Sequence, residues 1–355
     1  MKSEEKTLSE EIIALGYAGR RIAVVTDTHV AAIHAEGLLQ ELRQHFDTVL
    51  LITLEAGESH KNLATVQQIY EALLQGHFDR RDLLIAFGGG VVGDITGFAA
   101  ATYLRGIAYL QVPTTLLAMC DSSIGGKTGV DFSSYKNMVG AFYLPKLIFR
   151  RPEFLKTLPE RELRSGLAEV VKYGLICDAA FFVRVREALR GRDFLTLLKE
   201  DDETAASIIE DSCRYKTEIV EEDPTETGKR AILNFGHTIG HAIETLSGFT
   251  LLHGECVAIG SIAAAHISMQ RELLQVQDYE RICSAFADMD LPVTLTGPAD
   301  RYTRQEILRV MRSDKKADGD AIRFILLKGI GQAVIERDVT EEEIDAALKV
   351  IGVGV

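Results

Sequence analysis

Leu-Leu-Ile-Ala-Phe-Gly-Gly-Gly-Val-Val-Gly-Asp, residues 83–94, is the stretch that decides the fold. Its apolar start predicts a buried strand over 83–87, and the glycines predict a tight turn into a helix. Glycine lets a backbone approach a phosphate closely, and the amino end of a helix favours an anion. The run matches G-x-G-x-x-G, which is typical of dinucleotide loops, although a tight turn without a ligand fits the same residues.

The rest of the first half alternates short apolar runs with amphipathic segments. We expect further strands over 22–26, 49–54 and 107–112, and helices over 30–46 and 63–76. This rhythm predicts an α/β domain with a parallel, Rossmann-like sheet that is covered by helices on both faces. The glycine loop follows the third strand, and no acidic residue lies about 20 positions beyond it. A ribose contact would therefore come from Asp27, or from Glu58 with Lys61.

The periodicity changes near Pro159, and longer helical segments follow. They predict two domains, an α/β domain over 1–158 and a mainly α-helical domain over 159–355. The expected helices span 161–176, 205–220, 237–246, 255–271, 279–288 and 341–351, with a short strand over 321–327.

The composition excludes some classes of partner. The chain has 355 residues, a net charge of −13 and a pI near 5.2, so we expect neither nucleic acid nor an anionic membrane as a partner. Its five cysteines form no C-x-x-C pair, and its first residues do not resemble a signal peptide. We expect a cytoplasmic protein.

Three histidines carry the strongest chemical signal. His237 and His241 are one helical turn apart in Asn-Phe-Gly-His-Thr-Ile-Gly-His, and His253 follows in His-Gly-Glu. Two or three imidazoles with a carboxylate suit a divalent metal that keeps an open coordination position. Glu169 could supply that carboxylate, or it could simply form an ion pair with Lys172 within one helix. We assign no role to five histidines that are scattered through the first quarter of the chain without a partner at helical spacing: His29, His34, His45, His60 and His77.

Hydroxyl and cationic residues outside these motifs indicate a phosphorylated ligand. Pro-Thr-Thr at 113–115 and the glycine pair before Lys127 could bind a phosphate or ribose, although a glycine-rich surface loop fits the second motif as well. A buried phosphate needs several paired cations, which an acidic chain must gather locally. The remaining candidates are Lys216, Arg230 and the pair Lys315-Lys316.

Eight motifs in order resemble the signature of the 3-dehydroquinate synthases, from about residue 27 to 316. They are Gly-Gly-Gly-Val-Val-Gly-Asp, Arg-Gly with Pro-Thr-Thr-Leu-Leu-Ala, Asp-Ser-Ser-Ile-Gly-Gly-Lys, Lys-Asn-Met-Val-Gly-Ala-Phe, Leu-Pro-Glu-Arg-Glu-Leu, Ala-Glu-Val-Val-Lys, Leu-Asn-Phe-Gly-His-Thr-Ile-Gly-His-Ala-Ile-Glu and Leu-His-Gly-Glu.

The resemblance implies a shikimate-pathway lyase that converts 3-deoxy-D-arabino-heptulosonate 7-phosphate into 3-dehydroquinate and phosphate. It implies NAD and Zn²⁺ or Co²⁺ as cofactors, with transient oxidation by NAD, β-elimination of phosphate, reduction and an intramolecular aldol closure. It also implies a homodimer, an NAD-binding first domain and a metal- and substrate-binding second domain.

The resemblance assigns roles residue by residue. The implied metal ligands are Glu169, His237 and His253. The implied catalytic and substrate-binding residues are Arg105 from the neighbouring subunit, Asp121, Lys127, Asn137, Lys172, Lys216, Arg230, Asn234, His241 and Lys315 or Lys316. The implied NAD contacts are Asp27, Glu58, Lys61, Gly89, Gly90, Asp94, Thr114, Thr115, Lys136 and Thr157.

Two positions depart from the family pattern, and three rival functions stay open. Asp131 stands where the family more often has Asn, and Tyr135 stands where it more often has Gly, so the path of this loop could differ. A related sugar-phosphate cyclase would release phosphate but form another product. A metal-dependent polyol dehydrogenase would release NADH stoichiometrically, and a non-catalytic binding protein would show no turnover.

Overall fold

The computed structural model describes residues 6–133, 135–248, 250–295, 302–314 and 322–354. The chain divides into two compact units, Met1–Leu155 and Lys156–Val355. Within the described residues, none of the helices has the length and apolar character needed to cross a membrane.

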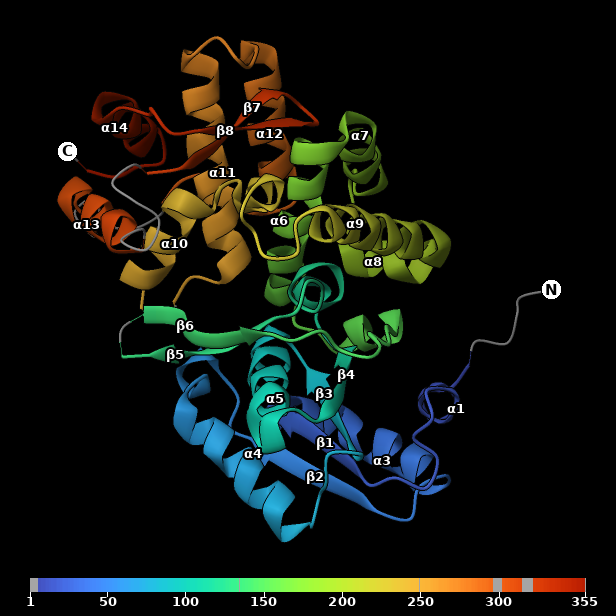
Figure 1. The fold of residues 1–355 in the computed structure, drawn as a ribbon. Helices are drawn as coiled ribbons and strands as arrows, with labels where there is room; N and C mark the ends of the chain where they lie inside the picture. The colour runs from blue at the N-terminus through green and yellow to red at the C-terminus, as the bar shows by residue number, and fades with distance from the viewer. Residues whose placement is uncertain (1–5, 134, 249, 296–301, 315–321, 355) are drawn as a thin grey trace. The chain divides into compact units, whose positions relative to one another are not determined.

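Unit 1 is built on a sheet of four parallel strands (Figure 1). The strands are β1 (Ile22–Asp27), β2 (Val49–Leu54), β3 (Leu83–Gly88) and β4 (Ala108–Pro113), in the order β2-β1-β3-β4. The predicted parallel α/β architecture is confirmed, and each predicted strand agrees with the observed one to within one residue at either end. The strand order reverses between β1 and β3, the place where ligands of such sheets bind beyond the carboxyl ends.

Helices cover both faces of this sheet because neighbouring strand residues point to opposite sides. Ile22 and Val24 of β1 pack with residues of α1 (Leu8–Ala14) and α3 (Glu36–Arg43). Ala23 and Val25 pack with residues of α4 (Leu63–Gln75) and α5 (Gly90–Thr102). Strands that are covered on both faces carry apolar residues at successive positions. Their sequences are therefore continuous apolar runs and do not alternate between apolar and polar residues.

The remaining elements of unit 1 are short, apart from one hairpin. They are α2 (Thr28–Val30), η1 (Ala31–Ala35), η2 (Glu58–His60), η3 (Tyr103–Arg105), η4 (Ala118–Ser122) and η5 (Pro152–Thr157), the last of which runs into unit 2. The antiparallel hairpin of β5 (Lys127–Phe132) and β6 (Tyr135–Phe142) lies where no strand was predicted, directly after the glycine pair that was interpreted as a ligand-binding motif or a surface loop. Gly129 and Gly140 lie opposite each other there. A β-carbon on Gly140 would lie 2.3 Å from the carbonyl oxygen of Thr128, so close backbones explain these glycines.

Unit 2 is mainly helical, as predicted. Its helices are α6 (Glu160–Cys177), α7 (Ala179–Ala188), α8 (Phe194–Glu200), α9 (Asp202–Glu222), η6 (Lys229–Asn234), α10 (His237–Leu246), α11 (His253–Gln270), α12 (Val276–Asp288), α13 (Arg304–Asp314) and α14 (Glu341–Val350). A hairpin of β7 (Phe324–Gly329) and β8 (Gln332–Glu336) completes it.

Helix α11 lies at the centre of unit 2 and packs on both α6 and α10. Glycines make these contacts unusually close. A β-carbon on Gly260 would lie 1.9 Å from the carbonyl oxygen of Gly236, and one on Gly254 would lie 1.9 Å from that of Ser165. The backbones that begin α10 and α11 are therefore fixed against their neighbours.

Candidate active site

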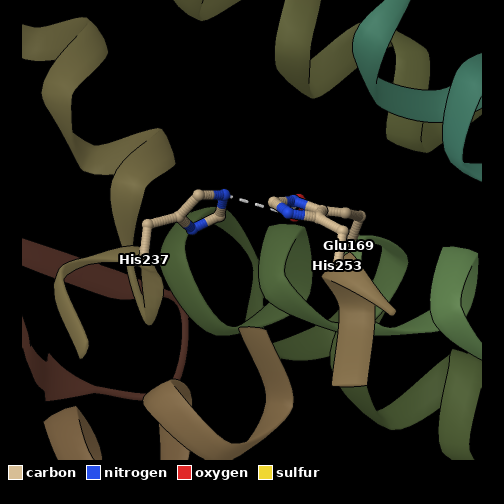
Figure 2. A group of neighbouring side chains, drawn as sticks. All are labelled: Glu169, His237 and His253. Carbon is tan, nitrogen blue, oxygen red and sulfur yellow. Dashed lines mark ion pairs between the residues drawn. The ribbon is translucent and has the colours of Figure 1, made fainter. Parts of the chain in front are cut away.

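The structure brings Glu169, His237 and His253 together within unit 2 (Figure 2). Glu169 lies in the middle of α6 and is fully buried, while His237 and His253 are the first residues of α10 and α11. One ligand atom of each residue lies within 4.8 Å of the others. His253 is the first residue of α11, which begins two residues before the predicted start of that helix.

The distances from Glu169 to the two imidazoles suit ligands that surround a cation tetrahedrally. Oε1 of Glu169 lies 3.4 Å from Nε2 of His237 and 3.3 Å from Nε2 of His253. Tetrahedral ligands about 2.05 Å from a zinc ion are about 3.3 Å apart. Two imidazoles and one carboxylate are a common catalytic zinc set, and they leave a fourth position for substrate.

Both imidazoles are held so that Nε2 faces the common point. Nδ1 of His237 lies 3.0 Å from the carbonyl oxygen of Phe235, which can only accept a hydrogen bond. Nδ1 of His253 lies 3.5 Å from Oε2 of Glu244. A proton on each Nδ1 leaves the Nε2 lone pairs for a cation.

Glu169 is both an ion-pair partner and a candidate ligand. Its Oε2 contacts Nζ of Lys172, one turn along α6, while its Oε1 faces the two imidazoles. The ion pair with Lys172 that the sequence suggested is therefore present. The other oxygen of the same carboxylate remains the candidate metal ligand.

The two histidines have opposite pKa shifts in the absence of a cation. Burial lowers the pKa of His237 well below its usual value, and the Lys172 cation adds to this effect. Burial also opposes protonation of His253, but hydrogen bonds to Glu169 and Glu244 outweigh it and raise its pKa to about 10. The two carboxylates beside His253 thus favour a positive charge at this point.

Helix α6 meets the start of α11 along a line of three contacts. Arg161 donates two hydrogen bonds of 2.7 Å to Glu255, and Ser165 Oγ accepts one of 3.0 Å from the backbone N–H of Gly254. Glu169 then meets His253 one turn further along. These contacts at 161, 165 and 169 lie on one face of α6 and fix the position of His253.

Four residues in this region were not predicted from the sequence. Arg161, Glu244 and Glu255 lie within the quoted motifs, and Ser165 lies between two of them. Glu244 had a detectable signal, since it lies three residues after His241 and shares its helix face. The contacts of Arg161 and Ser165 join distant segments, which one sequence does not reveal.

Among the other predicted substrate residues of unit 2, His241 lies on α10, and the rest that the structure describes lie on α6 or on elements that pack on it. The ring centroid of His241 is 5.0 Å from that of His237 and 5.9 Å from that of His253. Lys172, Lys216 on α9 and Arg230 on η6 are buried cations, and α6, α9 and η6 pack on one another. Asn234 donates to Glu226. Lys315 and Lys316 lie outside the described residues.

In unit 1, the predicted cofactor residues gather around Lys61. Its Nζ lies 2.6 Å from Oδ2 of Asp94 and 2.5 Å from Oδ1 of Asn137, and Glu58 pairs with Lys136 at 2.9 Å. Burial opposes the charge on Lys61, but Asp94 and Glu58 outweigh it and raise its pKa. Asn137, which was expected to contact substrate, thus lies with the predicted cofactor residues.

The position of Asn137 depends on Asp131, the first departure from the family pattern. Asp131 Oδ1 accepts a hydrogen bond of 2.8 Å from the backbone N–H of Asn137, whose φ is +51°. Burial raises the pKa of Asp131. Tyr135, the second departure, begins β6.

The ends of the parallel strands carry the other predicted cofactor residues. Asp27 ends β1, Gly89 and Gly90 begin α5, and Thr114 and Thr115 follow β4. The Thr114 hydroxyl is buried and has no hydrogen-bond partner within the described part of the chain. The first N–H groups of α5 also lack acceptors in their own helix. A phosphate or ribose fits these donors.

The remaining predicted residues lie on irregular segments or at element ends. Asp121 is in η4, Lys127 begins β5 and Thr157 ends η5. Arg105 is exposed in η3, where it and Leu104 have φ values of +65° and +49°.

The fold and the histidine–carboxylate group define a class: an α/β unit with a candidate dinucleotide loop, joined to a helical unit with a candidate divalent-metal centre. Two family descriptions match the chain, 3-dehydroquinate synthase N-terminal over residues 51–165 and 3-dehydroquinate synthase C-terminal over 166–317. The chain belongs to the 3-dehydroquinate synthase family.

Individual relatives agree with this assignment. The chain is 46% identical to 3-dehydroquinate synthase of Nitrosospira multiformis over 90% of its own length and 85% of the relative's. Among solved structures, it resembles 2-epi-5-epi-valiolone synthase of Streptomyces hygroscopicus with NAD⁺ and Zn²⁺ bound, with a TM-score of 0.89, 30% identity and 98% and 95% of the two chains covered. It also resembles 2-deoxy-scyllo-inosose synthase complexed with carbaglucose-6-phosphate, NAD⁺ and Co²⁺, with a TM-score of 0.85, 26% identity and 99% and 95% covered.

Proposed function

We propose that this chain is a 3-dehydroquinate synthase, which converts 3-deoxy-D-arabino-heptulosonate 7-phosphate into 3-dehydroquinate and phosphate with NAD and Zn²⁺ or Co²⁺. The observation that carries the proposal is the meeting of Glu169, His237 and His253 at one buried point, in a chain that matches both halves of this family. The 46% identity to a dehydroquinate synthase, against 30% and 26% to two other cyclases, favours this substrate over theirs.

The two cofactors supply a reversible hydride acceptor and a Lewis acid for the substrate hydroxyls. We assign metal binding to Glu169, His237 and His253. We assign the dinucleotide to unit 1, with its phosphates at the start of α5 and its sugars near Asp27 and the Lys61 cluster. The buried Thr114 hydroxyl supports this assignment. Gly89 and Gly90 support it as well, because a backbone without side chains lets a phosphate approach closely.

The predicted substrate-binding residues would bind the sugar phosphate and stabilise the departing phosphate. Lys172, Lys216 and Arg230 are buried cations in a chain of net charge −13, as a site for a phosphorylated anion requires. Hydrogen-bond donors that are already in place lower the cost of charge that develops during elimination. We assign the same task to Lys127 and to Arg105.

We further propose a cytoplasmic homodimer. Arg105 is exposed on a backbone with positive φ, which is costly for residues other than glycine and asparagine and is often kept for function. This supports the role of Arg105 in the neighbouring subunit's site. The cysteines are free in the structure, which suits a reducing compartment.

The function is tested by supplying the heptulosonate phosphate with zinc and an amount of NAD far below that of substrate. We expect many turnovers per NAD, with equal amounts of phosphate and 3-dehydroquinate and no accumulated NADH. A polyol dehydrogenase would instead consume NAD stoichiometrically and release no phosphate. Identification of another carbocycle by mass spectrometry and NMR would assign the chain to a related cyclase.

Zinc binding should release about one proton per site near neutral pH, because ligands must be deprotonated to bind a metal. His253 is protonated below its pKa of about 10 in the metal-free chain, whereas His237 is already neutral. Apparent zinc affinity should therefore rise with pH, by about tenfold per unit between pH 7 and 8.5. Calorimetric titrations in buffers of different ionisation enthalpy measure this number, and a value near zero would contradict the arrangement.

A further inference from the structure

Glu244 is a buried carboxylate to which the proposed chemistry assigns no task. It lies on α10, two turns after His237 and three residues after His241, and only 4% of its surface is exposed. Burial of a carboxylate is costly unless a charge or hydrogen-bond donor compensates it. The imidazole of His253 is one such group, and its Nδ1 lies 3.5 Å from Oε2 of Glu244.

The His253 imidazole therefore has a carboxylate at each nitrogen. Glu169 faces Nε2 at 3.3 Å, at the common point, and Glu244 faces Nδ1 on the other side of the ring. His237 has the same orientation, but a neutral carbonyl, that of Phe235, accepts its Nδ1 proton. The two histidines thus differ in the charge of the group that faces Nδ1, which is a carboxylate for His253 and a neutral carbonyl for His237.

We propose that Glu244 is a positioning residue of the metal centre, which acts through His253 and does not itself bind the ion. It holds the proton of His253 on Nδ1, so that Nε2 faces the cation, and its negative charge makes the imidazole a stronger donor. Carboxylates behind metal-bound imidazoles act in this way and affect metal affinity about 10- to 100-fold. The inference rests on the proposed metal-dependent function.

A different role for Glu244 is also chemically possible. His241, Glu244 and His253 also offer ligand atoms within 4.8 Å of one another, so Glu244 could bind an ion directly. The group of Glu169, His237 and His253 is favoured as the ligand set. Its two imidazoles both turn Nε2 toward one oxygen of Glu169, at separations that suit tetrahedral ligands. The two roles predict different losses of affinity.

The test measures zinc affinity of the full-length, metal-free protein by competition with a chromophoric chelator. Glu244→Gln keeps the shape and an acceptor oxygen but removes the charge, and we expect about tenfold weaker binding. Glu244→Ala removes the acceptor as well, and we expect a loss near 100-fold. Glu221→Gln, at an exposed position on α9, changes the net charge equally and should bind zinc as the parent does.

Glu169→Gln and His237→Ala, measured in parallel, separate the possible failures. Parent-like affinity in both Glu244 variants overturns the positioning role, including the case in which they only lower the unfolding temperature of the metal-free protein. Complete loss of zinc in Glu244→Gln, with affinity retained in Glu169→Gln, would make Glu244 a ligand and overturns it too. If Glu169→Gln and His237→Ala bind zinc normally, the proposed metal centre itself is wrong.

Discussion

His237→Ala should give a folded protein that neither holds zinc nor turns over substrate. The substitution removes one of three donors around the common point, and a Lewis acid contributes several kcal/mol to a barrier, so kcat should fall about 10³-fold or more. Burial keeps His237 neutral, and its Nδ1 contacts the carbonyl oxygen of Phe235. Glu169, which faces its Nε2, keeps the Lys172 ion pair when the ring is removed. The unfolding temperature of the metal-free protein should fall by only a few degrees.

His266→Ala is the matched control for this experiment. His266 is also a partly buried histidine of unit 2, on α11, and its ring packs against Tyr279. It should keep zinc and near-normal turnover. Glu169→Ala is a less clean test than His237→Ala, because it would also remove the partner of the buried Lys172 and so destabilise the fold. Near-normal rates in His237→Ala would refute the metal assignment.

Gly254→Ala should destabilise unit 2 and weaken zinc binding together. The added β-carbon would lie 1.9 Å from the carbonyl oxygen of Ser165, a backbone atom that no rotamer change can move away. Overpacking costs about 1–3 kcal/mol and occasionally more, and we expect the upper end of that range. Relief of the clash requires α11 to move away from α6, and His253 moves with it.

Gly37→Ala provides the comparison for the glycine substitution. Gly37 lies in α3 of unit 1, and a β-carbon there would meet nothing within 4 Å. Alanine should be neutral or stabilise the helix by up to about 1 kcal/mol. Chemical denaturation of both metal-free variants measures the difference, and zinc competition shows whether affinity falls with stability. A Gly254→Ala protein as stable as the parent would contradict the close contact.

The parallel sheet could be predicted because its strands are continuous apolar runs bounded by turn residues. The β5–β6 hairpin could not, since its glycines and polar residues hide the period of two that marks a strand. The glycines at 129 and 140 allow two backbones to approach closely, which a single sequence does not show.

For the candidate site, spacing located the histidines but not their surroundings. The i, i+4 pair and His-Gly-Glu predicted that His237 and His253 would come together, and the structure places them there. Sequence left Glu169 open between an ion pair and a ligand, because helical spacing reveals only neighbours on the same helix. The sequence assigned no role to Glu244, since its contact with His253 depends on how α10 and α11 pack.

All three candidate metal ligands come from a single compact unit, on helices whose spacing is set by backbone contacts at glycine. The arrangement of the three donors therefore depends on packing within unit 2. Exchange of residues in unit 1 should therefore leave the arrangement of these ligands unchanged. Exchange of Lys172 should alter it, because this cation contacts Glu169 directly.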